Sequence, residues 1–499
     1  MKDSEKKYLA YTVIIFIFFM GCYLHFNRGA HGIGVRSLSS LGAEDAYITY
    51  RYGWNLANFG VLSWNESGYR HTEGFTNPLW VLTSAGWSMF GQKELVYPLM
   101  AITSAAVTGI FLLVLLWMVK EVNAGSWAST TGIILVAITP VIWLHSTSGL
   151  ESAIFGVGLA TLAYSSLFTS KFSARIHIIL VILAVFLCLL RSDGFIYVGV
   201  ILLAALIAGS PGWKWVGVGL LLGVIIIFGW RYFSFGALLP NTAIAKINQK
   251  LRERLKFGLV TLLYIGMFSG IALFLLYGLA GARLEPRKIW LGSLIIIFGW
   301  IAYFLFIGSD YLLERHLVSL FFFTAALSGP LWSRVNLPVR ILLIALVLVS
   351  LGISVVKEFD RFHYWLQPTS DPWVMLGQEM ALDRDSYGVL VTSAAGKIPY
   401  YTGGDCIDAY GLNDPYLATL ERESFFPGHS AGSEKEAVLL AQSHPSGIYS
   451  HFTKLDPKII SGPEMVALWV FTRDPQGAVQ KTVTEAEWEQ AVQSGDRYI

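Results

Sequence analysis

The stretch Ile176–Gly209 reads IHIILVILAVFLCLLRSDGFIYVGVILLAALIAG, two apolar runs separated by the turn Arg191-Ser192-Asp193. One helical crossing of a bilayer core takes about 20 apolar residues, so the stretch is too long for one crossing and predicts a pair. Between two such runs, a neutralising ion pair of Arg191 with Asp193 costs less than either charge alone. The stretch therefore predicts two membrane helices joined by a charged turn.

Similar apolar runs recur along most of the chain. The 499 residues are 54% hydrophobic and 14% charged, and the formal net charge is +2. Soluble chains carry about 25% charged residues, so this chain has more apolar surface than a soluble core could bury. We expect a polytopic α-helical membrane protein with about eleven transmembrane helices. The runs lie near residues 8–26, 77–91, 95–119, 126–145, 149–170, 176–209, 213–235, 257–280, 288–307, 312–331 and 338–356.

The orientation follows from charge at the first run. Lys2, Lys6 and Lys7 precede it, and the positive-inside rule keeps such an end in the cytoplasm. We expect a retained first helix, because its flank offers no small-x-small cleavage site. The loop 27–75 then lies on the outer face.

The composition changes after Val356. Residues 357–499 are mixed polar, with a strand expected over 387–392 and a helix over 434–440. We expect a membrane catalytic domain over 1–356 and a soluble α/β domain over 357–499. An odd number of spans places this tail on the outer face and an even number in the cytoplasm; we favour the outer face.

The loop 27–75 holds the main candidate for chemistry, the stretch Glu44-Asp45-Ala46-Tyr47-Ile48-Thr49-Tyr50-Arg51. Acids beside a membrane are costly to desolvate and indicate a site, although solvated loop acids are the alternative. A helix capped by Ser39 or Ser40 and running to about Asn58 would place both acids at its positive end.

Aromatic residues on this expected helix share one face. Tyr47, Tyr50, Trp54 and Ala57 follow one another at helical spacing, which predicts a helix lying flat in the headgroup layer. An ordinary amphipathic connector explains the same stripe equally well.

A set of short motifs is spread over nearly the whole chain. The motifs are EDAYITYRY at 44–52, WN at 64–65, EGFTNPLW at 73–80, TSGLES at 147–152, LRSDG at 190–194, YFSFGALLPNT at 232–242 with AK at 245–246, GSD at 308–310 with Arg315, GKIPYY at 396–401 and DAYGLND at 408–414. In this order they resemble the motifs of the GT-C membrane glycosyltransferases, and most closely those of the AftB-type arabinofuranosyltransferases.

Two departures from the family pattern affect the expected roles. The family's acid pair is usually Asp-Asp, whereas Glu44 stands first here, so Asp45 becomes the better candidate for the base. The family's RPEG-like turn has Ser192-Asp193 in place of Pro-Glu, which keeps an acid but shortens it.

The resemblance implies an inverting transfer of a sugar, arabinofuranose, from a polyprenyl-phosphate donor to an acceptor hydroxyl. The implied donor is decaprenyl-phospho-arabinofuranose, and the acceptor is a cell-envelope glycan or a surface protein such as pilin. The implied location is the bacterial cytoplasmic membrane, with the active site facing the periplasm. Asp45, with Glu44 beside it, is the expected catalytic acid. Further residues expected to bind donor or substrate are Arg51, Arg70, His71, Glu73, Glu151, Arg191, Asp193, Asn241, Lys246, Asp310, Arg315 and His316.

Structural explanations stay open for several of these residues. Arg51 and Glu44 are seven residues apart and could pair along one helix, and Lys246 belongs to a basic run typical of a cytoplasmic loop. Arg191 and Asp193 could form a clasp between helices. Arg70 and His71 resemble an ordinary span end as much as a phosphate site. No spacing of His, Cys or acidic residues predicts a metal site.

A transporter or flippase of lipid-linked glycans is the competing class. It predicts inverted sequence halves, discontinuous helices and ionisable residues at mid-membrane depth. The charged residues here gather instead at the ends of the apolar runs.

Overall fold

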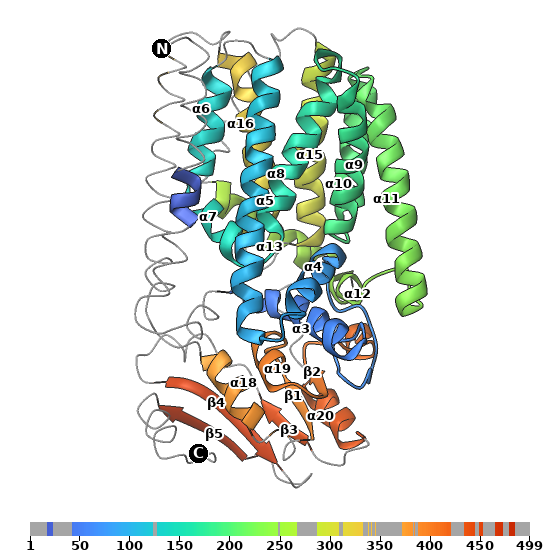
Figure 1. The fold of residues 1–499 in the computed structure, drawn as a ribbon, viewed down its shortest axis with the longest axis vertical. Helices are drawn as coiled ribbons and strands as arrows, with labels where there is room; N and C mark the ends of the chain where they lie inside the picture. Colours follow the sequence, from blue (N-terminus) through green and yellow to red (C-terminus); the bar gives the residue numbers. More distant parts are fainter. Residues whose placement is uncertain are drawn as a thin grey trace.

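The computed structural model describes residues 17–22, 42–122, 127–247, 250–266, 287–308, 313–332, 372–382, 388–420 and 434–444, three further strands at 449–452, 465–472 and 479–484, and the single residues 338, 341, 345 and 384. They form a long helix bundle with a sheet domain at one end (Figure 1). The helices α3 (Glu44–Phe59), α4 (Pro78–Ser88) and α12 (Asn241–Ile247) lie where the two parts meet.

Three helices of the described bundle are long and apolar enough to cross a membrane: α5 (Lys93–Val122), α11 (Gly212–Phe235) and Lys288–Ile307 within α15 (Arg287–Ile307). A fourth crossing results if α6 (Trp127–Ala137) and α7 (Pro140–Thr147) form one span, bent by 62°. The described residues therefore contain three or four helices that could cross a membrane. The expected count of eleven spans is not shown.

Shorter helices complete the bundle: α8 (Ser152–Leu167), α9 (Arg175–Leu190), α10 (Gly194–Ile207), α13 (Leu251–Gly266) and α16 (Val318–Trp332). The pair expected over 176–209 is present as two helices, α9 and α10, separated by the turn at 191–193, and both are shorter than the candidate membrane spans. The run at 77–91 contains only the 11-residue helix α4. At 1.5 Å per residue, such a helix is about half as long as a crossing requires.

Small residues let the bundle helices approach closely. All 16 residues of α8 are buried, and a Cβ on Gly156 would lie 2.5 Å from Val318 Cγ1 on α16. On α11, a Cβ on Gly219 would lie 2.6 Å from Ala184 Cβ on α9, and one on Gly223 would lie 2.7 Å from Cys188 Cβ. This glycine spacing of four is typical of helices that pack by close backbone approach in lipid.

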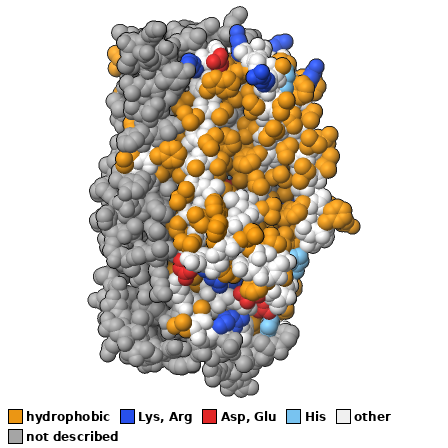
Figure 2. Space-filling view, in the orientation of Figure 1, with side chains coloured by type: hydrophobic (Ala, Val, Ile, Leu, Met, Phe, Trp, Pro, Cys, Tyr) orange, Lys and Arg blue, Asp and Glu red, His pale blue; other side chains and the backbone are white. Residues whose placement is uncertain are grey.

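The outside of the bundle is apolar. Large side chains such as Ile182 on α9 and Leu221 on α11 are more than half exposed. Figure 2 shows an apolar belt over the helices, with Lys, Arg, Asp and Glu gathered toward its two ends. A soluble protein rarely exposes an apolar patch of this extent. This surface is therefore compatible with contact to the lipids of a bilayer.

The sheet domain has five strands in the order β2-β1-β3-β4-β5. β1 is parallel to β2 and β3, while β3 with β4 and β4 with β5 are antiparallel. The elements are α18 (Pro372–Leu382), β1 (Val389–Thr392), α19 (Lys397–Thr402), β2 (Cys406–Asp408), η5 (Leu417–Thr419), α20 (Glu434–Gln442), β3 (Tyr449–Phe452), β4 (Met465–Thr472) and β5 (Val479–Thr484).

Two tail elements agree with the sequence expectations. The strand expected over 387–392 corresponds to β1, and the helix expected over 434–440 corresponds to α20. β1 is buried along its whole length because it lies inside the sheet. The expected domain boundary at 356/357 lies outside the described residues.

The helix expected in the loop 27–75 is present as α3, but it begins later than expected. Its N-cap is Ala43, which makes no side-chain capping bond, so the expected cap at Ser39 or Ser40 is wrong. It ends at Gly60, whose φ of 70° is a left-handed conformation that glycine adopts without strain. Both acids of the pair lie in its first turn.

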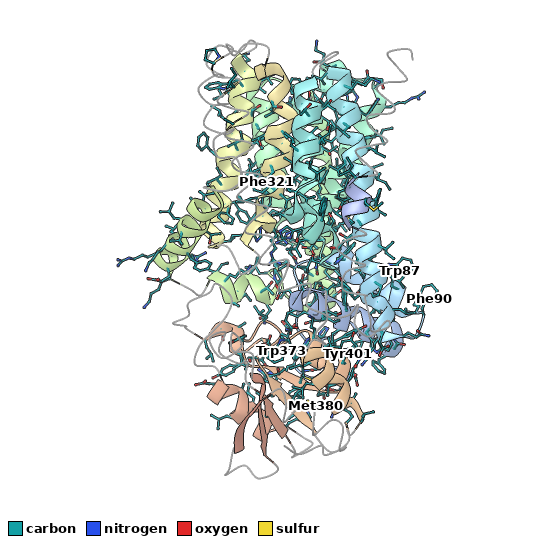
Figure 3. The ribbon with its side chains drawn as sticks, turned by 90° about the vertical axis from the view of Figure 1, so that its left-hand side faces the viewer. Trp87, Phe90, Phe321, Trp373, Met380 and Tyr401 are labelled. Atoms are coloured by element: carbon teal, nitrogen blue, oxygen red, sulfur yellow. The ribbon has the colours of Figure 1, made fainter. Side chains whose placement is uncertain are left out.

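The aromatic face of α3 packs on protein. Tyr47 and Tyr50 are fully buried, and Tyr47 contacts Tyr97 of α5 and Tyr400 and Tyr401 of α19, with a Tyr47–Tyr400 centroid distance of 5.4 Å. Figure 3 shows Tyr401 at the edge of the sheet domain that faces the bundle. The expectation that this face lies in the headgroup layer is wrong, because the tail supplies aromatic partners that no local pattern reveals.

Candidate functional site

The first turn of α3 presents Asp45 toward a cation. The Asp45 side chain is 28% exposed, and its Oδ2 lies 3.6 Å from Nη1 of Arg315 on η3 (Leu313–His316). The positive end of a helix dipole favours a carboxylate in the first turn. Asp45 is therefore held beside positive charge and remains accessible to solvent.

A second acid lies in the turn between α9 and α10. Asp193 Oδ1 is 2.9 Å from Arg191 Nε, and the Tyr303 hydroxyl donates to Asp193 Oδ2 at 3.2 Å. Burial alone would raise the pKa of Asp193, but the charges of Arg191, His316 and Lys246 outweigh it and hold the pKa well below its usual range. His316 and Lys246 therefore contribute positive charge to the surroundings of this carboxylate.

These contacts bring charged side chains from four segments together at one end of the bundle. Because Arg315 and His316 are consecutive, the environments of Asp45 and Asp193 adjoin. The helices α3 and α12 lie where the bundle faces the sheet domain (Figure 1). We call the following residues the charged cluster: Asp45, Asp193, Lys246, Arg315 and His316.

A buried clasp supports the charged cluster from inside the bundle. Arg191 Nη1 lies 2.8 Å from Glu151 Oε1, and both side chains are buried. The Asn77 amide donates to Glu151 Oε2 at 2.7 Å, and the Thr49 hydroxyl of α3 donates to Asn77 Oδ1 at 3.0 Å. Glu151 and Arg191 thus link α3 to the α9–α10 turn, which agrees with the clasp interpretation rather than with direct donor binding.

Glu73 forms a second buried ion pair. Its Oε2 lies 2.9 Å from Arg231 Nε on α11, and the Ser192 hydroxyl donates to Oε1 at 3.5 Å. Burial raises the pKa of Glu73 to about 7, against the opposing effect of Arg231. Sequence reasoning missed Arg231, whose only signal is a charge near the end of the apolar run 213–235. Glu73 therefore ties the loop to α11.

Glu44 binds backbone amides of the tail. Its Oε1 accepts the N–H of Gly396 at 2.8 Å, and the N–H of Lys397 lies 3.2 and 3.1 Å from Oε1 and Oε2. These hydrogen bonds account for both carboxylate oxygens. These contacts give Glu44 a structural role, and its expected catalytic role stays a prediction.

Arg51 is a buried connector between loop and tail. Its guanidinium donates to the carbonyl oxygens of Trp64, Pro399 and Gly404, and it lies 4.9 Å from the Trp64 ring centroid. All of these acceptors are uncharged protein groups, and among the described contacts none joins Arg51 to Glu44. The structure thus supports neither donor binding nor the expected helix-surface pair.

Two more expected binding residues, Arg70 of the loop and Asn241 of α12, contact the tail, and a third, His71, contacts the loop and α11. Arg70 forms an ion pair with Asp414, with Nη2 at 2.9 Å from Oδ1. His71 Nε2 lies 2.9 Å from the Leu62 carbonyl oxygen, and the ring stacks on Phe235. The Asn241 amide donates to the carbonyl oxygens of Gly411, Leu412 and Asp414. Arg70, His71 and Asn241 thus make structural contacts, and their expected binding roles stay predictions. Asp310 lies outside the described residues.

The charged cluster offers two partly exposed carboxylates beside cations, Asp45 at 28% and Asp193 at 16%, and such a group suits proton acceptance next to a developing anion. Within the described part of the chain, no group of three or more His, Cys, Asp or Glu side chains is placed to hold a metal ion. In comparisons with known proteins, no family model, no curated protein and no solved structure matches this chain.

Proposed function

We propose that this protein is an inverting glycosyltransferase that moves a sugar from a polyprenyl-phosphate donor to an acceptor hydroxyl. The observation that carries this proposal is the exposure of Asp45 and its position beside Arg315. Its side chain is 28% exposed and faces Arg315, whereas Glu73 and Glu151 are buried in ion pairs. Glu44 is hydrogen-bonded to backbone amides, and Asp193, 16% exposed, is bound by Arg191 and Tyr303, so Asp45 is the acid that we place within reach of an incoming hydroxyl.

Asp45 acts as the general base in this proposal. A sugar hydroxyl has far too high a pKa to lose its proton beforehand, so the proton moves to Asp45 as the bond to the new sugar forms. The anomeric carbon loses its bond to the donor phosphate and passes through an oxocarbenium-like state. Attack on the face opposite the leaving phosphate inverts the configuration.

Cations of the charged cluster receive the leaving group. Arg315, His316 and Lys246 come from η3 and α12, and negative charge grows on the phosphate as the glycosidic bond breaks. Fixed positive charge aimed at a developing anion is among the largest contributions to catalysis. Arg315 is the foremost candidate, because a planar guanidinium binds two phosphate oxygens at once.

A lipid-linked donor suits the position of the charged cluster. The cluster lies at the end of the bundle, and the apolar belt covers the bundle's side (Figure 2). A prenyl chain along that belt would leave its phosphate at the level of these charges. We propose an eleven-span GT-C arrangement, with this end facing the periplasm of a bacterial cytoplasmic membrane.

The sugar and acceptor in this proposal come from the resemblance of the sequence motifs. The donor is decaprenyl-phospho-arabinofuranose, and the acceptor is an envelope glycan or a surface protein such as pilin. The test is purified protein in nanodiscs with this donor and an arabinan oligosaccharide, measuring release of decaprenyl phosphate. Release that requires the acceptor and is lost in Asp45→Asn supports the proposal. No release with any polyprenyl-linked sugar contradicts it.

One observation favours a second candidate, a flippase for lipid-linked glycans. The helices α6 and α7 are apolar and meet at a 62° bend, and discontinuous helices are typical of transporters. The distinguishing experiment uses liposomes holding the protein and a fluorescent polyprenyl-linked sugar. Movement between leaflets without acceptor would support the flippase, and product formation without movement would support the transferase.

A further inference from the structure

Glu44 and Asp45 are consecutive residues of α3 with different surroundings. Successive side chains on a helix point about 100° apart. The Asp45 carboxylate faces Arg315, and the Glu44 carboxylate faces the backbone of the tail at Gly396 and Lys397. One turn of helix therefore carries both the proposed base and an attachment to the sheet domain.

The attachment is tight because a glycine lies opposite Glu44. A Cβ on Gly396 would lie 2.0 Å from the Glu44 carbonyl oxygen, closer than any side chain permits. The helix α19, which follows Gly396, is entirely buried. Its Tyr400 contacts Tyr47, the residue three positions beyond Glu44, and Lys397 Nζ lies 5.6 Å from the Tyr47 ring centroid. The first turn of α3 is thus held against α19 by its backbone and by its side chains.

We propose that Glu44 is a positioning residue for Asp45. By accepting two backbone N–H groups of the tail, Glu44 fixes the rotation and height of the first turn of α3, and thereby the place of the Asp45 carboxylate relative to Arg315. Hydrogen bonds from amides to an ionised carboxylate are short and directional. A displacement of about 1 Å at a reacting group lowers the rate about 100-fold. This inference rests on the proposed role of Asp45.

The kinetic test compares Glu44→Ala, Glu44→Gln and Asp45→Asn in the nanodisc assay. Glu44→Ala removes the acceptor and lowers kcat about 10- to 100-fold, while KM for the donor changes less than about twofold. Glu44→Gln keeps an acceptor oxygen for both amides, so kcat stays within about threefold of wild type. If Glu44→Gln is as inactive as Asp45→Asn, Glu44 takes part in the chemistry and the proposal is overturned.

The control is Ser67→Ala, which removes a different hydrogen bond between loop and tail. The exposed Ser67 hydroxyl donates to Asp405 Oδ2, far along the chain from the first turn of α3. We expect wild-type kcat and KM in this variant. A loss equal to that of Glu44→Ala would mean that any weakening of the interface lowers the rate, which overturns a specific role for Glu44.

Hydrogen exchange followed by mass spectrometry tests the attachment without any enzyme assay. Amides in peptides covering 42–50 and 394–402 should exchange faster in Glu44→Ala and in Gly396→Ala, and at wild-type rates in Glu44→Gln and Ser67→Ala. Unchanged exchange in Glu44→Ala would overturn the proposal. If wild-type protein transfers no sugar, the proposed function fails, and the exchange pattern still decides whether Glu44 holds this turn.

Discussion

Charged residues of the charged cluster and of the interface between loop and tail differ in how fully they are bound. At the interface, the buried Arg51 donates to three backbone carbonyl oxygens. In the charged cluster, Asp45 is partly exposed and lies 3.6 Å from Arg315, a longer and looser contact. Charges saturated by fixed partners hold a fold together, whereas a charge with spare capacity can bind and react.

The largest expected effect is on the charged cluster, at the proposed base. Asp45→Asn removes the proposed base without changing size, so sugar transfer should fall about 1,000-fold, within the range of general-base catalysis. The thermal unfolding midpoint should stay at the wild-type value, because Asp45 is not part of the buried bonding. Wild-type turnover in this variant would remove Asp45 from the mechanism.

The next largest effect is expected at the buried ion pairs. Arg191→Met leaves the buried Glu151 carboxylate and Asp193 without their shared cation. Removing one partner of a buried ion pair costs about 3–5 kcal/mol, so the thermal unfolding midpoint should fall markedly. The matched comparison is Lys214→Met, a change of a lysine at the start of α11, which should leave the midpoint within error. Equal midpoints in both variants would contradict the clasp.

A smaller effect is expected at the cation of the charged cluster. Arg315→Gln should lower kcat about 100-fold, the usual loss when one stabilising donor at a developing anion is removed. Arg315→Lys should recover part of that loss, because a point charge remains while the two-pronged geometry does not. A wild-type kcat in Arg315→Gln would exclude this residue from phosphate stabilisation.

The smallest effect concerns pH. Burial raises the pKa of Glu73 from 4.5 to about 7. Between these two pH values, the folded protein keeps a proton on Glu73 that the unfolded chain has already lost. Stability should therefore fall as pH rises from about 4.5 to about 7, and then level off. Thermal midpoints of wild type minus those of Glu73→Gln, measured from pH 5 to 8, should show this slope. A flat or rising difference would contradict it.

Helices with a regular pattern were the part of the fold most open to sequence reasoning. The pair α9 and α10, the helix α3, the strand β1 and the helix α20 follow from hydrophobic spacing and composition. The start of α3 could not be predicted, because Ala43 offers no capping side chain and the turn is instead held by the tail. Long-range contacts of this kind leave no local pattern.

The same reason explains the outcome at the site. The acid pair was correctly placed in the first turn of a helix, but sequence alone could not say which acid faces the tail and which faces Arg315. Arg51 and Arg70 stand in motifs that suggest phosphate binding, yet their partners lie in the residues 399–414. A charge pattern shows that a cation is present, but only the fold shows which groups bind that cation.

The contact between Glu44 and Gly396 joins residues 352 positions apart. A ribosome adding about 5–20 residues per second needs roughly 20–70 seconds to make the second partner after the first. Throughout that interval the bundle lacks Gly396, the partner of Glu44. If Asp45 is the base, as proposed, the protein would acquire a correctly placed base only after about four-fifths of its 499 residues have been synthesised, and shorter chains would leave the proposed lipid carrier unaltered.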